Sequence, residues 1–165
     1  MKCALIALSN QEAQLALALA RKLPNADVFV HDQVSLNPSP ACALKRFRSI
    51  LALTAEIFSR YHGLIYIAPC GVATRAIAAN IKSKFTDPAV VVVDAGGRFA
   101  ISLLSGHEGG ANDLAMTVSN LLSAEPVIST TSEALKTVIA GVGCRRGISA
   151  RRIVIALKAT LKEAD

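Results

Sequence analysis

Residues 105–110 contain the side-chain types that acid–base chemistry and anion binding need. The segment reads Ser105, Gly106, His107, Glu108, Gly109 and Gly110, and apolar residues at helical spacing follow it. Backbone N–H groups of Gly109 and Gly110 at a helix start would favour a carboxylate or a developing oxyanion. The imidazole of His107 is suited to general-base catalysis near neutral pH. The alternative is a tight turn in which the glycines only permit the bend and His107 caps a neighbouring group.

Two other glycine-bearing turns qualify as ligand sites, because ligands of parallel α/β sheets bind beyond the carboxyl ends of strands. The first is residues 69–71, which includes Gly71 and places Arg75 one turn inside the next helix. The second is residues 141–147, where Arg145 and Arg146 either bind carboxylates in a bidentate manner or form ordinary surface. The turn at residues 105–110 is neither a Walker motif nor a dinucleotide-binding fingerprint.

Three further charged residues stand at turns. Arg98 lies opposite Asp94 across a predicted hairpin, and an exposed pair of this kind is worth under about 1 kcal/mol. Asp87 precedes a proline at the start of a predicted strand, where a carboxylate commonly fixes a turn.

These residues need a scaffold, and the chain alternates strand and helix patterns. We predict strands at 3–8, 26–31 and 63–68, helices at 10–22, 45–60 and 72–81, a hairpin of residues 90–94 and 98–104, a helix at 111–123, strands at 126–129 and 138–144, and a helix at 149–163. Ser9 and Glu12 fit a capping box at the first helix. The fold class predicted is a three-layer α/β/α protein with a mostly parallel sheet and one β-hairpin insertion.

Composition sets the class of protein. The 165 residues are 52% hydrophobic but only 4% aromatic, which suits Val/Ile strands and Ala/Leu helices. The apolar runs are far shorter than the roughly 20 residues of a membrane span. The first residues read as a strand rather than an export signal, so we expect a cytoplasmic protein with reduced cysteines and no membrane partner. Three histidines and no Cys-x-x-Cys pair predict no protein-built metal site.

The net charge of +6 is concentrated at one end. Residues 136–165 carry seven basic and two acidic side chains, whereas residues 1–135 carry eleven and ten. A basic tail can meet nucleic acid, a membrane surface or an acidic small molecule, and it can equally be a solvated helix face. Nucleic acid is the weakest reading, because the aromatic residues are too few for a stacking platform.

Three runs of sequence carry a resemblance to a known family. They are residues 67–80 with Gly71 and Arg75, residues 84–94 with Lys-Phe-Thr-Asp-Pro-Ala-Val-Val-Val-Val-Asp, and residues 97–112 with Gly-Arg-Phe-Ala-Ile-Ser-Leu-Leu-Ser-Gly-His-Glu-Gly-Gly-Ala-Asn. The chain resembles the N-terminal region of the cobalt-precorrin-5A hydrolases, the CbiG family of anaerobic cobalamin biosynthesis. The resemblance implies hydrolytic opening of a δ-lactone on a cobalt-corrinoid, with release of acetaldehyde to give cobalt-precorrin-5B. The cobalt would come with the substrate, so no separate cofactor is expected.

The resemblance also implies roles for individual residues. His107 would be the general base or acid and Glu108 a weaker candidate, while axial contact of His107 with the substrate cobalt ranks below the acid–base role. Oxyanion contacts would come from Ser105 and Asn112 and from the N–H groups of Gly109 and Gly110. The remaining substrate-binding candidates are Gly71, Arg75, Asp94, Arg98, Gly106, Arg145 and Arg146.

A second resemblance divides the chain. Residues 141–147 are similar to the opening of the family's C-terminal domain, which predicts an N-terminal domain over 1–133 and a strand–helix unit over 134–165. The middle segment of the family has no counterpart here. The alternatives are therefore a compact hydrolase, one half of a split hydrolase and a non-catalytic corrinoid-binding protein. Expected partners are a cobalt-corrinoid, other cobalamin-pathway enzymes or a chain supplying the missing region, and the oligomeric state, a homodimer included, stays open.

Overall fold

The computed structural model describes residues 1–36, 44–131, 143 and 148–163. The chain divides into two compact units, Met1–Thr130 and Thr131–Asp165, and each is described by itself. The predicted domain boundary between residues 133 and 134 stays a prediction. The last predicted strand also stays a prediction, because its residues 138–142 and 144 lie outside the described residues.

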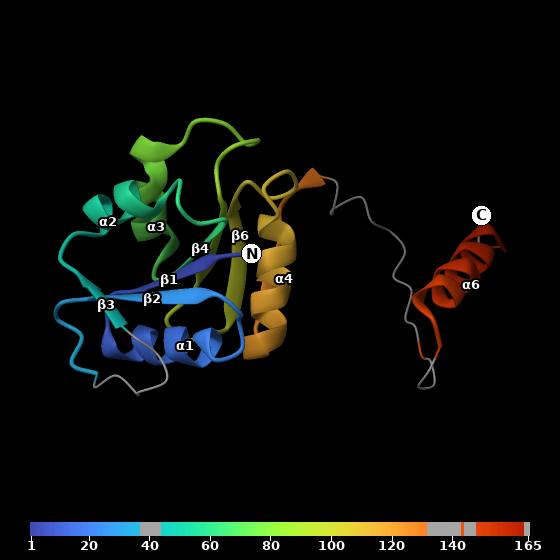
Figure 1. Ribbon diagram of the computed structural model, residues 1–165, viewed down its shortest axis with the longest axis horizontal. Helices are drawn as coiled ribbons and strands as arrows, with labels where there is room; N and C mark the ends of the chain where they lie inside the picture. Colours follow the sequence, from blue (N-terminus) through green and yellow to red (C-terminus); the bar gives the residue numbers. More distant parts are fainter. Residues whose placement is uncertain (37–43, 132–142, 144–147, 164–165) are drawn as a thin grey trace. The chain divides into compact units, whose positions relative to one another are not determined.

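A seven-stranded sheet forms the centre of the first unit (Figure 1). Its strands are β1 (Cys3–Ala7), β2 (Ala26–His31), β3 (Leu44–Phe47), β4 (Gly63–Ile67), β5 (Ala89–Val93), β6 (Phe99–Leu104) and β7 (Glu125–Val127). Their order in the sheet is β3-β2-β1-β4-β5-β6-β7. Strands β1 to β5 are parallel, β6 pairs antiparallel with β5, and β7 pairs parallel with β6. The last two strands therefore run against the other five.

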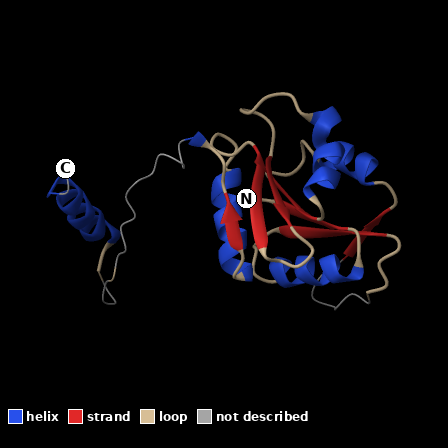
Figure 2. Ribbon diagram, turned by 180° about the vertical axis from the view of Figure 1, so that it is seen from behind, coloured by secondary structure: helices blue, strands red, loops and turns tan. Residues whose placement is uncertain are grey.

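Helices cover both faces of the sheet (Figure 2). Helices α1 (Asn10–Ala20) and α4 (Ala111–Leu122) pack on one face through Ala and Leu side chains. Helices α2 (Ile50–Ile57) and α3 (Cys70–Ile77) pack on the other, and α3 continues into the short 3₁₀ helix η1 (Ala78–Asn80). The three-layer α/β/α class and the hairpin insertion are thus confirmed.

Local sequence signals account for several helix and turn positions. Ser9 Oγ accepts a hydrogen bond from the Glu12 N–H, and the Glu12 carboxylate accepts one from the Ser9 N–H, which confirms the predicted capping box. Gly97 adopts a φ of 67° in the hairpin turn, a conformation that glycine reaches without a steric penalty.

The predicted helix at 45–60 is wrong at its start. Residues Leu44–Phe47 form β3, an edge strand paired with β2, and α2 begins only at Ile50. Lys45 and Arg46 are exposed on this edge, so the strand lacks the apolar alternation by which a sequence reveals one. Main-chain pairing with β2, which the local sequence does not report, decides the conformation.

The second unit contains helix α6 (Ala150–Glu163), in agreement with the predicted helix at 149–163. Val154 and Ile155 are exposed on it. Across the described residues, no helix combines the length and the apolar character that crossing a bilayer requires.

Tyr66 provides a test of the packing between β4 and α2. Its side chain is fully buried and its hydroxyl shares a hydrogen bond of 2.8 Å with Thr54 Oγ1. Burial raises the pKa of Tyr66 to about 12. An unfolded tyrosine ionises near pH 10, so below pH 10 both states stay protonated, and above it ionisation favours the unfolded state. We expect this group to lower the free energy of unfolding by about 2–3 kcal/mol between pH 10 and pH 12.

Urea unfolding of the unaltered protein and of Tyr66→Phe between pH 9 and pH 12 isolates this contribution, because all other titrating groups are shared. The phenylalanine variant should lose the Tyr66 part of the slope. Its stability at neutral pH should fall by about 1 kcal/mol, since Thr54 loses its buried partner. A folded protein in which both tyrosines ionise near pH 10 would contradict the prediction.

Candidate functional site

The candidate residues lie at opposite edges of the sheet. We call the edge where β1 to β5 end the carboxyl edge, and the opposite edge, where they begin, the amino edge. Gly71 and the Asp94–Arg98 hairpin turn follow β4 and β5 and lie at the carboxyl edge. Because β6 runs antiparallel, it ends at the amino edge, and residues 105–110 lie there. The expectation that these turns occupy equivalent ends of a parallel sheet is therefore wrong.

At the carboxyl edge, Asp94 organises its own hairpin turn. Its carboxylate accepts hydrogen bonds from the N–H groups of Arg98 and Phe99 at 2.7 and 2.8 Å and from Arg98 Nε at 3.0 Å. Partial burial disfavours the charged carboxylate, but these hydrogen bonds outweigh it and hold the pKa of Asp94 below its ordinary value. The alternative of an Arg98–Asp94 pair is confirmed, and contact of either residue with a substrate stays a prediction.

The other predicted arginines are spread out. Arg75 is exposed on α3, one turn after the exposed Gly71. Arg145 and Arg146 lie outside the described residues.

At the amino edge, a loop of residues 105–110 leads into α4, and we call it the Ser105 loop. Its backbone caps the helix: the Ser105 carbonyl accepts from the N–H groups of Gly109 and Ala111, both at 3.1 Å, and the Gly106 carbonyl accepts from Asn112 N–H at 2.9 Å. Gly110 has a φ of 82°, and a Cβ added to it would meet nothing within 4 Å. The predicted glycine-rich helix start is confirmed.

Ser105 itself is the unusual member of this loop. It has a φ of 57°, which is uncommon for a residue other than glycine, and it is only 7% exposed. Its hydroxyl is buried without a hydrogen-bond partner, the sole such side-chain oxygen or nitrogen in the described part of the chain. Buried polar groups are nearly always paired, so an orphan hydroxyl in a strained loop marks a candidate ligand contact.

Removing the Ser105 hydroxyl should change the stability of the protein and its ligand affinity in opposite directions. We expect Ser105→Ala to raise the free energy of unfolding by about 1 kcal/mol, because a buried polar group without a partner no longer has to be desolvated. Binding of a ligand that uses the hydroxyl should weaken in the same variant. Chemical denaturation gives the first quantity and ligand titration the second. A loss of stability would show instead that the hydroxyl has a partner in solution.

Asn112 points into the protein. Its Oδ1 accepts from Ser102 Oγ at 2.8 Å and its Nδ2 donates to Thr130 Oγ1 at 2.9 Å, and the residue is 5% exposed. A Cβ on Gly106 would lie 2.8 Å from both Asn112 Oδ1 and Thr130 Cγ2. Asn112 thus ties the segment after β7 to the Ser105 loop, while its predicted oxyanion contact stays a prediction.

His107 and Glu108 occupy the outer side of the loop. His107 is exposed, and its ring makes no hydrogen bond to any other residue that the structure describes. Glu108 forms an ion pair with Lys84, whose Nζ lies 2.6 Å from Oε1. This hydrogen bond from Lys84 lowers the pKa of Glu108. Glu108 is therefore held in its charged form and joins two turns, and the imidazole is the freer of the two predicted catalytic groups.

Several residues of this region escaped prediction as site residues. Lys84 lies 24 positions before its partner Glu108 in the sequence. The sequence pointed to it only as part of the run at residues 84–94 that resembles the family. The alternative for Asp87, that it fixes a turn, is confirmed: its buried carboxylate accepts from the N–H groups of Lys82 and Ser83 at 2.9 and 3.0 Å. Thr130 and Ser102 gave no signal, because only the fold brings them to Asn112.

A hollow of about 310 Å³ adjoins the start of α4. Its lining includes Gly110 and Asp113 from the helix start and Met1, Cys3 and Pro24 from neighbouring segments. Burial raises the pKa of the Cys3 thiol, so this cysteine is not an activated nucleophile. The described residues hold no group of three or more His, Cys, Asp or Glu side chains able to bind a metal ion.

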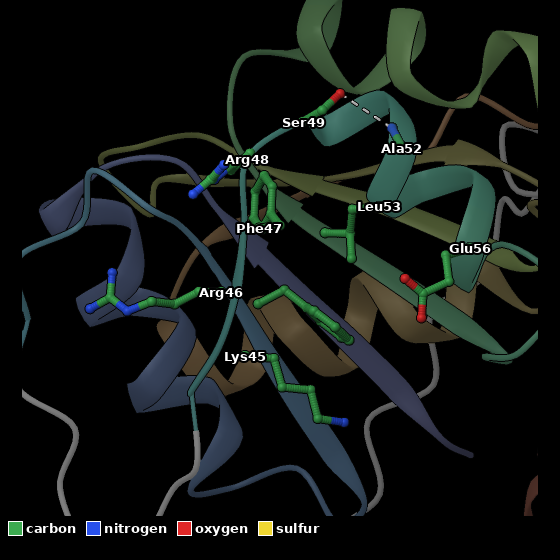
Figure 3. A pocket seen from close by; sticks show the side chains of 9 residues that line it. Lys45, Arg46, Phe47, Arg48, Ser49, Ala52, Leu53 and Glu56 are labelled. Atoms are coloured by element: carbon green, nitrogen blue, oxygen red, sulfur yellow. Dashed lines mark hydrogen bonds between the residues drawn. The ribbon is translucent and has the colours of Figure 1, made fainter.

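A second hollow, of about 490 Å³, lies between β3 and α2 (Figure 3). Leu53 and Glu56 reach from α2 toward β3, whereas Arg46 and Arg48 extend away from α2. The cations around it already have partners: Lys45 pairs with Asp27 and Arg48 with Asp32. The hollow holds none of the predicted site residues.

Comparison with known proteins identifies the family. Residues 52–133, which contain α3, Lys84, the Ser105 loop and all of α4, match the family described as cobalamin synthesis G, N-terminal. The cobalt-precorrin-5A hydrolase of Priestia megaterium is 38% identical over 136 residues, 82% of this chain. The chain belongs to the CbiG family. The cobalt-precorrin-5A hydrolase of Salmonella typhimurium is 47% identical over 78 residues, 47% of this chain.

The fold agrees with a solved member of the group. The crystal structure of a cobalamin biosynthesis protein G homolog from Sulfolobus solfataricus superposes with a TM-score of 0.58 at 24% identity, covering 98% of this chain and 46% of that one. The CbiG relatives are longer: the matched regions span 36% of the Priestia protein and 22% of the Salmonella protein.

Proposed function

We propose that this CbiG-family chain acts in cobalamin biosynthesis on cobalt-precorrin-5A, where water opens the δ-lactone and acetaldehyde leaves. Membership of the family and the names of two curated relatives support the substrate and the reaction. The Ser105 hydroxyl indicates where the site lies. It is buried without a hydrogen-bond partner, within the region that matches the family.

The amino edge suits hydrolysis of a lactone. Attack of water on the lactone carbonyl needs a group that takes the proton and donors for the developing oxyanion. The exposed imidazole of His107 is the proton acceptor in this proposal. The oxyanion would be met by the Ser105 hydroxyl and by the Gly110 N–H at the start of α4, where the helix dipole also favours negative charge. The Gly109 N–H is less suited to this role, because it already donates to the Ser105 carbonyl. Lys84 adds positive charge beside the loop.

The substrate's acetate and propionate groups require cations. Lys82 and Lys84 at the amino edge are exposed, as are Arg75 and Arg98 at the carboxyl edge. Because the two arginines lie across the sheet from the Ser105 loop, we assign carboxylate binding near the reacting lactone to the lysines.

A strictly anaerobic assay of the purified chain with cobalt-precorrin-5A, with acetaldehyde trapped as it forms, tests the proposal. Catalytic release of acetaldehyde would support a complete enzyme. The second candidate is a corrinoid-binding protein that does not itself hydrolyse the lactone. A corrinoid that co-elutes with the protein without acetaldehyde would support that candidate, and neither binding nor release would refute both.

A further inference from the structure

The turn that precedes β5 has a fixed conformation. We call residues Ile81–Asp87 the Asp87 turn. Besides the two hydrogen bonds to the Asp87 carboxylate, the Ser83 carbonyl accepts from the N–H groups of Thr86 and Asp87 at 3.1 and 2.9 Å. Asp87 is 6% exposed, so these bonds are shielded from water. The turn therefore fixes the backbone from which its outer side chains project.

Two of those outer side chains are large and apolar, beside the exposed Lys82 and Lys84. Phe85 is 74% exposed, the most exposed large apolar side chain among the described residues, and Ile81 is 45% exposed. A single exposed apolar residue needs no explanation, but two on one turn beside a candidate site are available for a ligand to cover.

The Asp87 turn and the Ser105 loop form one surface. The Lys84–Glu108 ion pair links them, and a Cβ on Gly109 would lie 3.2 Å from the Asp87 carbonyl. The ammonium of Lys84 also lies 5.0 Å from the centre of the Phe85 ring. In Figures 1 and 2 the segment between η1 and β5 and the start of α4 are on the same side of the first unit. An aromatic ring, a cation and an unpartnered hydroxyl are thus assembled at the amino edge.

We propose that Phe85 and Ile81 form the apolar platform of the substrate site, on which the face of a carboxylate-bearing macrocycle lies. Lys84 and Lys82 then meet carboxylates at the rim of the ring while its reacting edge reaches the Ser105 loop. The inference rests on the proposed function. It adds the residues that would make the site bind a large macrocycle in preference to a small carboxylic acid. Charge complementarity favours this occupant over a second copy of the chain, because Lys82 and the exposed His107 border the platform and the acidic Glu108 beside it is already paired with Lys84.

Titration with cobyrinic acid, a corrinoid ring with free carboxylates, tests the platform through the change in its visible absorption. We expect Phe85→Ser to raise the dissociation constant of cobyrinic acid about tenfold or more, because the aromatic contact with the bound ring is lost. The matched control is Leu51→Ser on α2, which removes a 56% exposed apolar side chain remote from the amino edge and should change the constant less than twofold. Thermal unfolding of both variants should match the unaltered protein, since neither side chain is buried.

A second probe separates the ring from its charges. Cobinamide carries the same ring with amide side chains, so its binding should depend on Phe85 but not on Lys84, tested as Lys84→Met. Equal binding of cobyrinic acid by the unaltered chain and Phe85→Ser would overturn the platform alone. Failure of the unaltered chain to bind either corrinoid would overturn the proposed function with it. Unchanged corrinoid binding together with a lower mass in sedimentation for Phe85→Ser would assign the surface to self-association and overturn the platform.

Discussion

Replacing Gly109 with alanine is expected to lower the free energy of unfolding by about 2–3 kcal/mol, as overpacking does in other cores. A Cβ at this position would lie 2.4 Å from Ser105 Cβ, 3.0 Å from the Ser105 carbonyl oxygen and 3.2 Å from the Asp87 carbonyl oxygen. Two of these atoms belong to the backbone, so the Ser105 loop and the Asp87 turn must separate. We expect corrinoid binding to fall at least tenfold as the two turns move apart. Urea denaturation and cobyrinic acid titration measure the two effects.

Other substitutions of glycine by alanine provide the controls. Gly71→Ala should be neutral or slightly stabilising, because its nearest neighbour is Arg75 Nη1 at 3.6 Å and alanine is the better helix former. Combining Gly109→Ala with Ser105→Gly removes the closest contact and should recover part of the lost stability. If Gly109→Ala alone were as stable as the unaltered protein, the close packing of the two turns would be refuted.

Replacing His107 with alanine is expected to reduce acetaldehyde release by about 10²- to 10⁴-fold, the usual contribution of a positioned general base. The free energy of unfolding should change by less than about 0.5 kcal/mol, because the side chain is exposed. The two readings together separate a chemical role from a structural one. Turnover in the anaerobic assay and denaturation of the same preparation provide them.

His62 supplies the matched control, because it is an exposed histidine that immediately precedes β4 at the same edge. His62→Ala should leave turnover within about twofold, the scatter expected of a residue with no contact to the reacting atoms. Added imidazole should restore part of the activity of His107→Ala if the ring transfers a proton. Normal turnover by His107→Ala would remove it from the mechanism and direct attention to the Ser105 hydroxyl and Lys84.

Local patterns were sufficient to predict much of the scaffold. The capping box depends on residues three positions apart, and the hairpin of β5 and β6 depends on the glycines between them, so short-range chemistry determines both. The apolar period over residues 111–122 likewise predicted α4 within one residue. The hairpin turn and the presence of a helix start after Gly110 were therefore readable from the sequence.

Edge-strand pairing was not readable in this way. Lys45 and Arg46 lie on β3, where main-chain hydrogen bonds to β2 maintain a strand although the side chains face water. A segment of this kind has no apolar alternation, and its conformation depends on a strand thirteen or more residues earlier. The local sequence therefore predicted helix where the sheet imposes a strand.

The sequence by itself determined the family, the layered α/β class and the chemical character of the Ser105 loop, because these follow from local patterns and from a long run of matched residues. Only the tertiary structure decided where that loop lies and what surrounds it. The antiparallel direction of β6 carries it to the amino edge, away from Arg75 and Arg98. There Lys84 meets Glu108 across 24 residues of sequence, Gly109 packs closely against Ser105 and Asp87, and the buried Ser105 hydroxyl has no partner among the described residues. These contacts arise between distant segments, and their distances and burial exist only once the sheet has formed.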